Sequence, residues 1–279
     1  NGKAYLEKFL PDVVLYSQPY EVVLVDNGST DGSSEFVKSK FPSVTLIEFE
    51  HNHGFCGGYN KAIPHIDSEY IVLLNTDVEV TKNWIQPIYD FLKSNPEYKA
   101  AQPKILDQNN KSKFEYAGAA GGYLDHLGYP FCRGRIFQSI EEDHGQYDNI
   151  RDVFWASGSS LFIKKEAYIS LGGLDHEFFA HMEEIDLCWR IWNSGSKVAA
   201  VPESKVYHVG GGTLKKANPR KTYLNFRNGL SILIKNEHKS SLLWKIPLRI
   251  FLDYAAVLKF SIESGPSHGI AILKAHWYN

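Results

Sequence analysis

The hydrophobic pattern of the chain alternates between two periods, which together predict strands separated by helices. Short apolar runs with the length and composition of buried strands cover residues 21–26, 44–49, 70–74 and 98–102. Apolar residues at helical spacing lie between these runs, over residues 3–16, 29–40, 57–66 and 81–94. Because strands and helices alternate, we predict an α/β fold with a mostly parallel sheet, flanking helices and right-handed crossovers.

The second half of the chain has a different pattern. Residues 105–150 are rich in Gly, Asp, Asn and Tyr, which predicts loops and short hairpins. Regular elements then resume as strands over 153–164, 198–201 and 205–208 and helices over 165–171, 182–194 and 220–236. Residues 240–262 are strongly apolar and amphipathic, and Pro247 predicts a break near their start. We therefore divide the chain into residues 1–104, residues 105–214 and a C-terminal helical extension over 215–279.

Composition narrows the classes of function. The 279 residues include 30 Lys plus Arg and 32 Asp plus Glu, and this balance argues against a nucleic-acid partner. Cys56, Cys132 and Cys188 have no metal-binding spacing, so we expect reduced thiols. The sequence shows neither a signal peptide nor a run of about 18 apolar residues. We therefore expect a cytoplasmic protein.

Carboxylates follow two of the predicted strands, and a third acidic cluster lies further along the chain. Asp26 ends the run Val-Val-Leu-Val, and Asp77 follows strand 70–74 in the sequence Asn75-Thr76-Asp77. The carboxyl ends of parallel strands meet at one edge of a sheet, where α/β proteins bind ligands. One carboxylate could contact a nucleotide and the other could hold a metal ion. The cluster Glu183-Glu184-Ile185-Asp186 could supply a base.

Three further motifs accompany the carboxylates. The segment Asn52-His53-Gly54-Phe55-Cys56-Gly57-Gly58-Tyr59-Asn60 joins a strand to a helix, and its glycines allow close approach of backbone to a nucleotide. Trp155-Ala156-Ser157-Gly158 follows the loop-rich region, and His208 follows a strand in the sequence His-Val-Gly-Gly-Gly-Thr. Asp186 and Arg190 are four residues apart on a predicted helix, which favours a structural ion pair.

In their order along the chain, these motifs resemble those of family 2 glycosyltransferases of the GT-A type, in particular rhamnosyltransferase-like bacterial members. The resemblance covers residues 1–237 and implies a nucleotide-sugar-binding half over 1–104 and an acceptor-binding, catalytic half over 105–214. It implies inverting, metal-dependent transfer of a sugar from dTDP-rhamnose or a UDP-sugar. The implied acceptor is a hydroxyl of a bacterial surface glycan or a lipid-linked glycan, and the implied cofactor is Mg²⁺ or Mn²⁺.

The resemblance also implies roles for individual residues. Asp26 would accept a hydrogen bond from the imide N–H of uracil or thymine. Asp77 would ligate the metal ion, with His208 as a further ligand. Glu184 would be the catalytic base, at a position where the family has Asp, and Glu183 lies beside it. The residues expected near the donor are Asn27, Asn52, Gly54, Gly57, Asn60, Asn75, Arg133, Arg135, Trp155 and Gly158.

Several of these assignments have a structural alternative. Asp26 could cap the following helix, Trp155 could be a core residue, and His208 could serve only the fold. Arg133 and Arg135 could neutralise a diphosphate or simply lie on the surface. For the whole protein, a nucleotidyltransferase and a non-catalytic glycosyltransferase-like scaffold are the alternative functions.

Two expectations concern the ends of the chain. Asn1-Gly2-Lys3 resembles the end of the family's first strand and loop, so we expect that strand to precede residue 1 and to lie between strands 22–26 and 70–74. Restoring it should raise the melting temperature, because both neighbours would otherwise keep unpaired backbone groups. Residues 240–262 combine a wide apolar face with Lys and Arg, which suits peripheral contact with the inner face of the cytoplasmic membrane or with a membrane-bound partner. The alternatives for this segment are packing on the catalytic domain and an oligomer interface.

Overall fold

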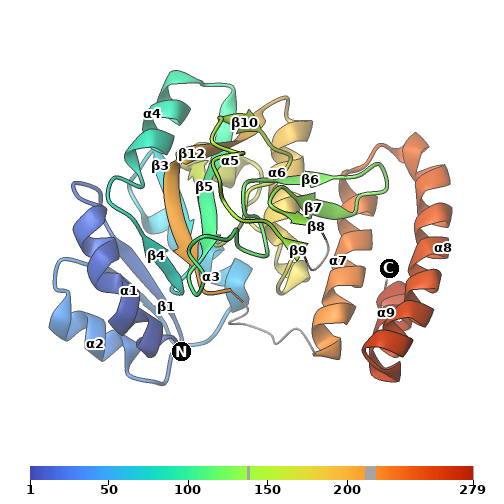
Figure 1. Ribbon diagram of the computed structural model, residues 1–279. Coiled ribbons are helices and arrows are strands. Elements are labelled where there is room, and N and C mark those ends of the chain that lie inside the picture. Colours follow the sequence, from blue (N-terminus) through green and yellow to red (C-terminus); the bar gives the residue numbers. More distant parts are fainter. Residues whose placement is uncertain (137–138, 211–217, 279) are drawn as a thin grey trace.

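The computed structural model describes residues 1–136, 139–210 and 218–278 (Figure 1). The elements of the first half are α1 (Lys3–Tyr16), β1 (Val23–Asn27), α2 (Ser33–Lys40), β2 (Thr45–Phe49), α3 (Gly54–Ala62), the 3₁₀ turn η1 (Ile63–His65), β3 (Tyr70–Leu74), β4 (Val78–Val80), α4 (Gln86–Ser94) and β5 (Tyr98–Asp107). Apart from β4, each of these strands and α-helices was predicted from the sequence pattern.

The second half begins with short hairpin strands and ends in three helices. Its elements are β6 (Gly122–Leu124), β7 (Pro130–Cys132), β8 (Arg135–Ile136), β9 (Ser139–Ile140), β10 (Arg151–Asp152), β11 (Ser160–Lys164), α5 (Lys165–Ser170), the 3₁₀ turn η2 (His176–Phe178), α6 (Glu183–Asn193), β12 (Lys197–His208), α7 (Pro219–Asn236), α8 (Lys239–Glu263) and α9 (Pro266–Tyr278). The pattern did not predict α9, and the expected break at Pro247 is wrong, because α8 continues through it.

The main sheet has the strand order β10-β12-β5-β11-β3, with β4 also paired to β12. β5 and β12 are parallel, whereas β11 is antiparallel to both β5 and β3. β3, β5 and β12 therefore run in the same direction, and their carboxyl ends lie at the same edge of the sheet. Asp77 follows β3 and His208 ends β12, so this topology brings two predicted site residues to one edge.

Both faces of the main sheet are covered by helices. Along β5, Ala100 belongs to one buried cluster and Ala101 to the other, as the period of two in a strand requires. α4 supplies Ile88 to the cluster of Ala101, and α6 supplies Leu187 to the cluster of Ala100. The helices α7, α8 and α9 stand at the opposite end of the molecule from α1 and α2 (Figure 1).

β1 and β2 form a separate parallel pair, and among the described residues neither strand pairs with the main sheet. A cavity of about 510 Å³ lies between β1 and β3, and apolar residues of α1 line it as well. The two strands do not pair directly, so the expected strand between them stays a prediction.

The two proposed domain boundaries can be compared with the observed strands and helices. The boundary after residue 104 lies inside β5, so the first two segments share a strand. The boundary after residue 214 lies outside the described residues, as do residues 211–213 of the sequence after His208. None of the helices in the described part of the chain has the length and apolarity that crossing a membrane requires.

Candidate active site

Asp26 lies at the end of β1 and is only 7% exposed. Its Oδ1 accepts a hydrogen bond from the backbone N–H of Ser29 at 2.7 Å, and its Oδ2 accepts one from the Ser34 hydroxyl. Burial raises the pKa of this carboxyl group, but the hydrogen bonds outweigh burial and hold it below its ordinary value. Asp26 therefore organises the turn into α2, and its remaining lone pairs keep acceptor capacity for a ligand.

Asn27 joins β1 to the glycine-rich loop before α3. Its Oδ1 accepts a hydrogen bond from His53 N at 2.9 Å, and its Nδ2 donates to Gly54 O at 2.8 Å. Asn52 Oδ1 accepts from Gly54 N at 2.8 Å and so closes the turn. A Cβ atom at Gly57 would lie 2.9 Å from the Cβ of His53, so close packing in the loop requires glycine there.

Asp77 and His208 meet because β4 folds back antiparallel to the end of β12. Asp77 Oδ1 lies 3.2 Å from His208 Nε2, and His208 Nδ1 lies 3.5 Å from Glu115 Oε1. Burial lowers the pKa of His208, but the two carboxylates outweigh burial and raise it to about 9. Glu115 was not predicted as a site residue, and the loop-rich region brings it here.

Asp77 and His208 are chemically suited to a divalent cation, since carboxylate oxygen and imidazole nitrogen are common ligands. No group of three His, Cys, Asp or Glu side chains in the described ranges is arranged to hold a metal ion. Phosphate oxygens and water would therefore have to complete the coordination, as they do in many phosphate-binding sites.

The Trp-Ala-Ser-Gly segment connects the two acidic regions. Immediately after it, the carbonyl oxygen of Ser159 accepts a hydrogen bond from Asn75 N at 3.0 Å. A Cβ atom at Gly158 would lie 3.5 Å from the Cβ of Glu184, which is van der Waals contact. Two adjacent residues thus contact the Asn75-Thr76-Asp77 turn and the start of α6, and they bring Asp77 and Glu184 into one region.

Glu183 and Glu184 begin α6, where the helix dipole favours negative charge. The Oε2 atom of each is enclosed by protein and has no hydrogen-bond partner among the described residues. Burial, and after it the neighbouring Glu184, raises the pKa of Glu183 to about 8. Burial also raises the pKa of Glu184. Enclosed carboxyl groups of this kind are candidates for accepting a proton from a substrate.

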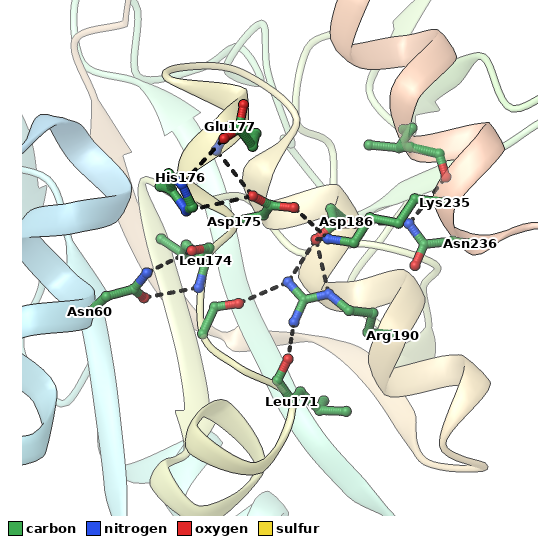
Figure 2. A network of polar contacts seen from close by, with 12 residues as sticks. Asn60, Leu171, Leu174, Asp175, His176, Glu177, Asp186, Arg190, Lys235 and Asn236 are labelled. Atoms are coloured by element: carbon green, nitrogen blue, oxygen red, sulfur yellow. Dashed lines mark hydrogen bonds and ion pairs between the residues drawn. The ribbon is translucent and has the colours of Figure 1, made fainter. Parts of the chain in front are cut away.

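Asp186 lies in the same first turn of α6, but hydrogen-bond donors surround its carboxylate (Figure 2). It is fully buried, and its Oδ2 accepts hydrogen bonds from Arg190 Nε at 2.9 Å and Lys235 Nζ at 2.9 Å. Its Oδ1 accepts one from Asn236 Nδ2 at 2.8 Å. The predicted ion pair of Asp186 and Arg190 is therefore confirmed. Asp186 also ties α6 to the end of α7.

The sequence model of a protein family described as "Glycosyl transferase family 2" matches residues 1–149, which is more than half of the chain. The chain belongs to this family. It is therefore a glycosyltransferase, and the alternatives of a nucleotidyltransferase and a non-catalytic scaffold are set aside.

Two curated relatives of this glycosyltransferase are rhamnosyltransferases. The N-acetylglucosaminyl-diphospho-decaprenol L-rhamnosyltransferase of Mycobacterium tuberculosis is 26% identical, over 91% of this chain and 87% of the relative. The rhamnosyltransferase WbbL of Escherichia coli is 22% identical, over 73% of this chain and 78% of the relative.

Among solved structures, the mannosyltransferase PcManGT of Pyrobaculum calidifontis, in complex with GDP-Man and Mn²⁺, is 15% identical with a TM-score of 0.62. That match covers 100% of this chain and 84% of PcManGT, and the expected GT-A fold is confirmed.

Two side chains expected near the donor form hydrogen bonds within the glycosyltransferase, and their place at the donor stays a prediction. Trp155 is 6% exposed, and its Nε1 donates a hydrogen bond to Tyr123 O at 3.0 Å, so it is a core residue. Asn60 Nδ2 donates to Leu174 O at 2.6 Å, and Asn60 Oδ1 accepts from Leu174 N at 3.0 Å (Figure 2). Asn60 therefore fastens α3 to the turn after α5, a role that the motif did not reveal.

The two candidate arginines also have partners in the protein. The guanidinium group of Arg133 donates to the carbonyl oxygen of Ala120, from Nε at 2.8 Å. The guanidinium carbon of Arg135 lies 4.1 Å from the ring centroid of Tyr116, beside Glu115. These contacts favour the structural alternative for Arg133, whereas a role of Arg135 at the diphosphate stays a prediction.

Asn228 of α7, which was not predicted as a site residue, holds the loop that precedes Glu183 and Glu184. In this loop Phe179, His181 and Met182 have positive φ angles, which are costly for residues other than glycine. Asn228 is fully buried, and its Nδ2 donates to the carbonyl oxygens of Phe178, Ala180 and His181 at 2.7–3.0 Å. The available signal was the helical spacing of Asn228 with Leu224 and Ile232, which places a polar residue on the apolar face of helix 220–236.

Proposed function

We propose that this glycosyltransferase transfers an L-rhamnosyl group, with inversion, from a nucleotide diphosphate donor to a hydroxyl of a lipid-linked acceptor. The observation that carries the proposal is that Glu183 and Glu184 each have an enclosed Oε2 atom without a hydrogen-bond partner in the described part of the chain, beside the segment that also contacts Asn75. The names of the M. tuberculosis and E. coli relatives support the sugar. The name of the M. tuberculosis relative supports a lipid-linked acceptor.

The residues of the site divide the work of a single displacement. Asp26 accepts a hydrogen bond from the imide N–H of the donor base, for which its free lone pairs suffice. Asp77 and His208 hold a divalent cation, which when bound stabilises the negative charge of the departing diphosphate. Glu184 removes the proton of the acceptor hydroxyl as that oxygen bonds to the anomeric carbon and the bond to the diphosphate breaks. One displacement without a covalent intermediate inverts the anomeric configuration.

The proposal is tested with a panel of donors that includes dTDP-rhamnose, UDP-sugars and GDP-mannose. Each donor is incubated with a prenyl-diphosphate-linked N-acetylglucosamine acceptor, with and without Mn²⁺. We expect transfer from dTDP-rhamnose that depends on Mn²⁺, and NMR of the product should show the inverted anomer. A product of retained configuration would contradict the mechanism, and transfer of another sugar would correct the donor.

The metal site is tested separately by Asp77→Ala. We expect calorimetry to show that Mn²⁺ no longer strengthens binding of the nucleotide, because a direct ligand has been removed. Glu79→Ala is the matched control, since Glu79 lies two residues away and pairs with Lys111. Unchanged affinity for nucleotide plus Mn²⁺ in Asp77→Ala would show that the assignment is wrong.

A further inference from the structure

The polarity of α8 is reversed relative to that of an ordinary surface helix. Its two buried residues are the charged Arg249 and Asp253, and large apolar side chains point outward. We call Leu243, Phe251, Leu258 and Ile262 the α8 face, since they lie within about one third of the helix circumference. Leu243 is 80% exposed and Ile262 is 84% exposed. The alternative that these side chains pack on the catalytic domain is therefore wrong.

The inner side of α8 is fixed to the body of the molecule by polar contacts. Arg249 Nη1 donates to Leu127 O at 2.8 Å, and the guanidinium carbon of Arg249 lies 3.5 Å from the ring centroid of Tyr129. Tyr129 Oη donates to Asp253 Oδ1 at 2.6 Å, and His276 Nε2 lies 3.1 Å from Asp253 Oδ2. These contacts orient the helix, so its apolar face is held outward.

The apolar surface continues onto α9. The ring of Tyr254 stacks on that of His276 with 5.8 Å between centroids, so the edge of the α8 face meets α9. Ile270 is exposed on α9, and Trp277 is 94% exposed. Contiguous exposed apolar surface of this kind marks an interaction site.

Charge distinguishes a lipid surface from a second copy of this chain. Within residues 239–278, Arg249 and Asp253 are buried and Lys245 pairs with Glu237, so the exposed charges of this segment are those of Lys239, Lys259, Lys274 and Glu263. Two copies meeting through this segment would bring two positive surfaces together, which is unfavourable. Anionic lipid headgroups complement the positive charge, and exposed Trp and Tyr side chains suit the interface between headgroups and hydrocarbon.

We propose that α8 and α9 dock the glycosyltransferase onto an anionic lipid bilayer, with the α8 face lying in the interface. Such a surface would present the enzyme to a lipid-linked acceptor, but the docking stands on the exposed residues and the charge alone. Vesicle binding is measured without donor or acceptor, so this proposal and the proposed function can fail separately.

The test is co-sedimentation of the full chain with phosphatidylcholine vesicles, with and without phosphatidylglycerol, at low and high salt. We expect binding to the anionic vesicles at low salt and weaker binding at high salt. The variant Phe251→Glu with Leu258→Glu should bind at least about 10-fold more weakly, because each change places a charge where an apolar group enters the bilayer. Lys239→Gln with Lys274→Gln should lose about fivefold per charge on anionic vesicles.

The matched control is Leu15→Glu with Ile169→Glu, which makes the same chemical change at exposed residues of α1 and α5. The control should bind vesicles like the unaltered chain, and melting curves should show that all variants fold. If the glutamate variant of the α8 face fails to fold, Phe251→Ser with Leu258→Ser takes its place. No binding to anionic vesicles at low salt, or equal binding by the α8 variant, would overturn the proposal. A dimer in sedimentation velocity that the α8 variant dissociates would assign the face to a second copy instead.

Discussion

The first turn of α6 contains two kinds of carboxylate, although its acids are neighbours in the sequence. Asp186 receives hydrogen bonds from Arg190, Lys235 and Asn236, and it holds two helices together. Glu183 and Glu184 are also enclosed, but each has a carboxyl oxygen without a partner in the described part of the chain. The comparison teaches that the hydrogen-bond donors around an acid, rather than the acid itself, separate a structural group from one available for chemistry.

The sharpest test of this comparison is Glu184→Gln. Glutamine keeps the shape of the side chain but cannot accept the proton, so we expect kcat to fall by about 10²–10⁴-fold. Donor affinity, measured by calorimetry, should be unchanged. If turnover survives in Glu184→Gln and is lost in Glu183→Gln, the base is Glu183.

The opposite outcome is expected for Asp186→Asn. This change removes the anionic partner of Arg190 and one of the two carboxylates that pair with Lys235, so the free energy of unfolding should fall by about 3 kcal/mol. Urea denaturation measures the loss, with the exposed Glu7→Gln on α1 as the control. Loss of turnover without loss of stability would break the distinction between the two kinds of acid.

The pH dependence of stability sharpens the comparison further. The pKa of Glu183 is raised from 4.5 to about 8, so the folded state favours its protonated form. The stabilising effect of protonated Glu183 is complete below pH 4.5 and is lost as the pH rises through 8. Glu183→Gln cannot ionise, so its free energy of unfolding should match that of the unaltered chain at low pH. Above pH 8 the free energy of unfolding of Glu183→Gln should exceed that of the unaltered chain by an amount on the order of a few kcal/mol. Parallel pH curves for the two proteins would contradict the enclosed state of Glu183.

The smallest expected effect is that of Asn228→Ala. Three carbonyl groups of the loop before Glu183 lose their donor, so stability should fall by about 1–2 kcal/mol. If Asn228 positions the glutamates, kcat should fall while the KM for the donor stays constant. Asn225→Ala, a half-buried asparagine of the same helix, is the control and should change neither quantity.

Much of the fold follows from local pattern. The strand over 70–74 and the helix over 3–16 have the predicted bounds because their apolar spacing is regular. Where the pattern failed, a distant contact was responsible. In α9, Gly269 weakens the helical signal, but a Cβ atom there would lie 2.0 Å from the hydroxyl of Ser261, so the packing of α8 on α9 requires glycine. The predicted strand 153–164 begins only at Ser160, and before it the backbone of Trp155 pairs with Gly122 of β6.

The residues of the candidate site also fall into those that local sequence predicted and those that only distant contacts reveal. The sequence identified Asp26, Asp77, Glu183 and Glu184, because acids after apolar strands and at a helix start are visible in a single segment. It could not identify Asn228 or Glu115, and it did not show that Trp155 and Asn60 face inward. Their partners lie far away in the chain, so no local spacing records them.

The sequence by itself determined the order of strands and helices, the positions of the acids and the family of the protein. Only the tertiary structure decided which of those acids are neutralised and which keep an unpaired oxygen, and which apolar face of the C-terminal helices stays exposed. The physical reason is that the periodicity of a helix or strand depends on neighbouring residues. The pKa of a carboxyl group and the burial of a helix face depend on groups that folding brings from distant segments.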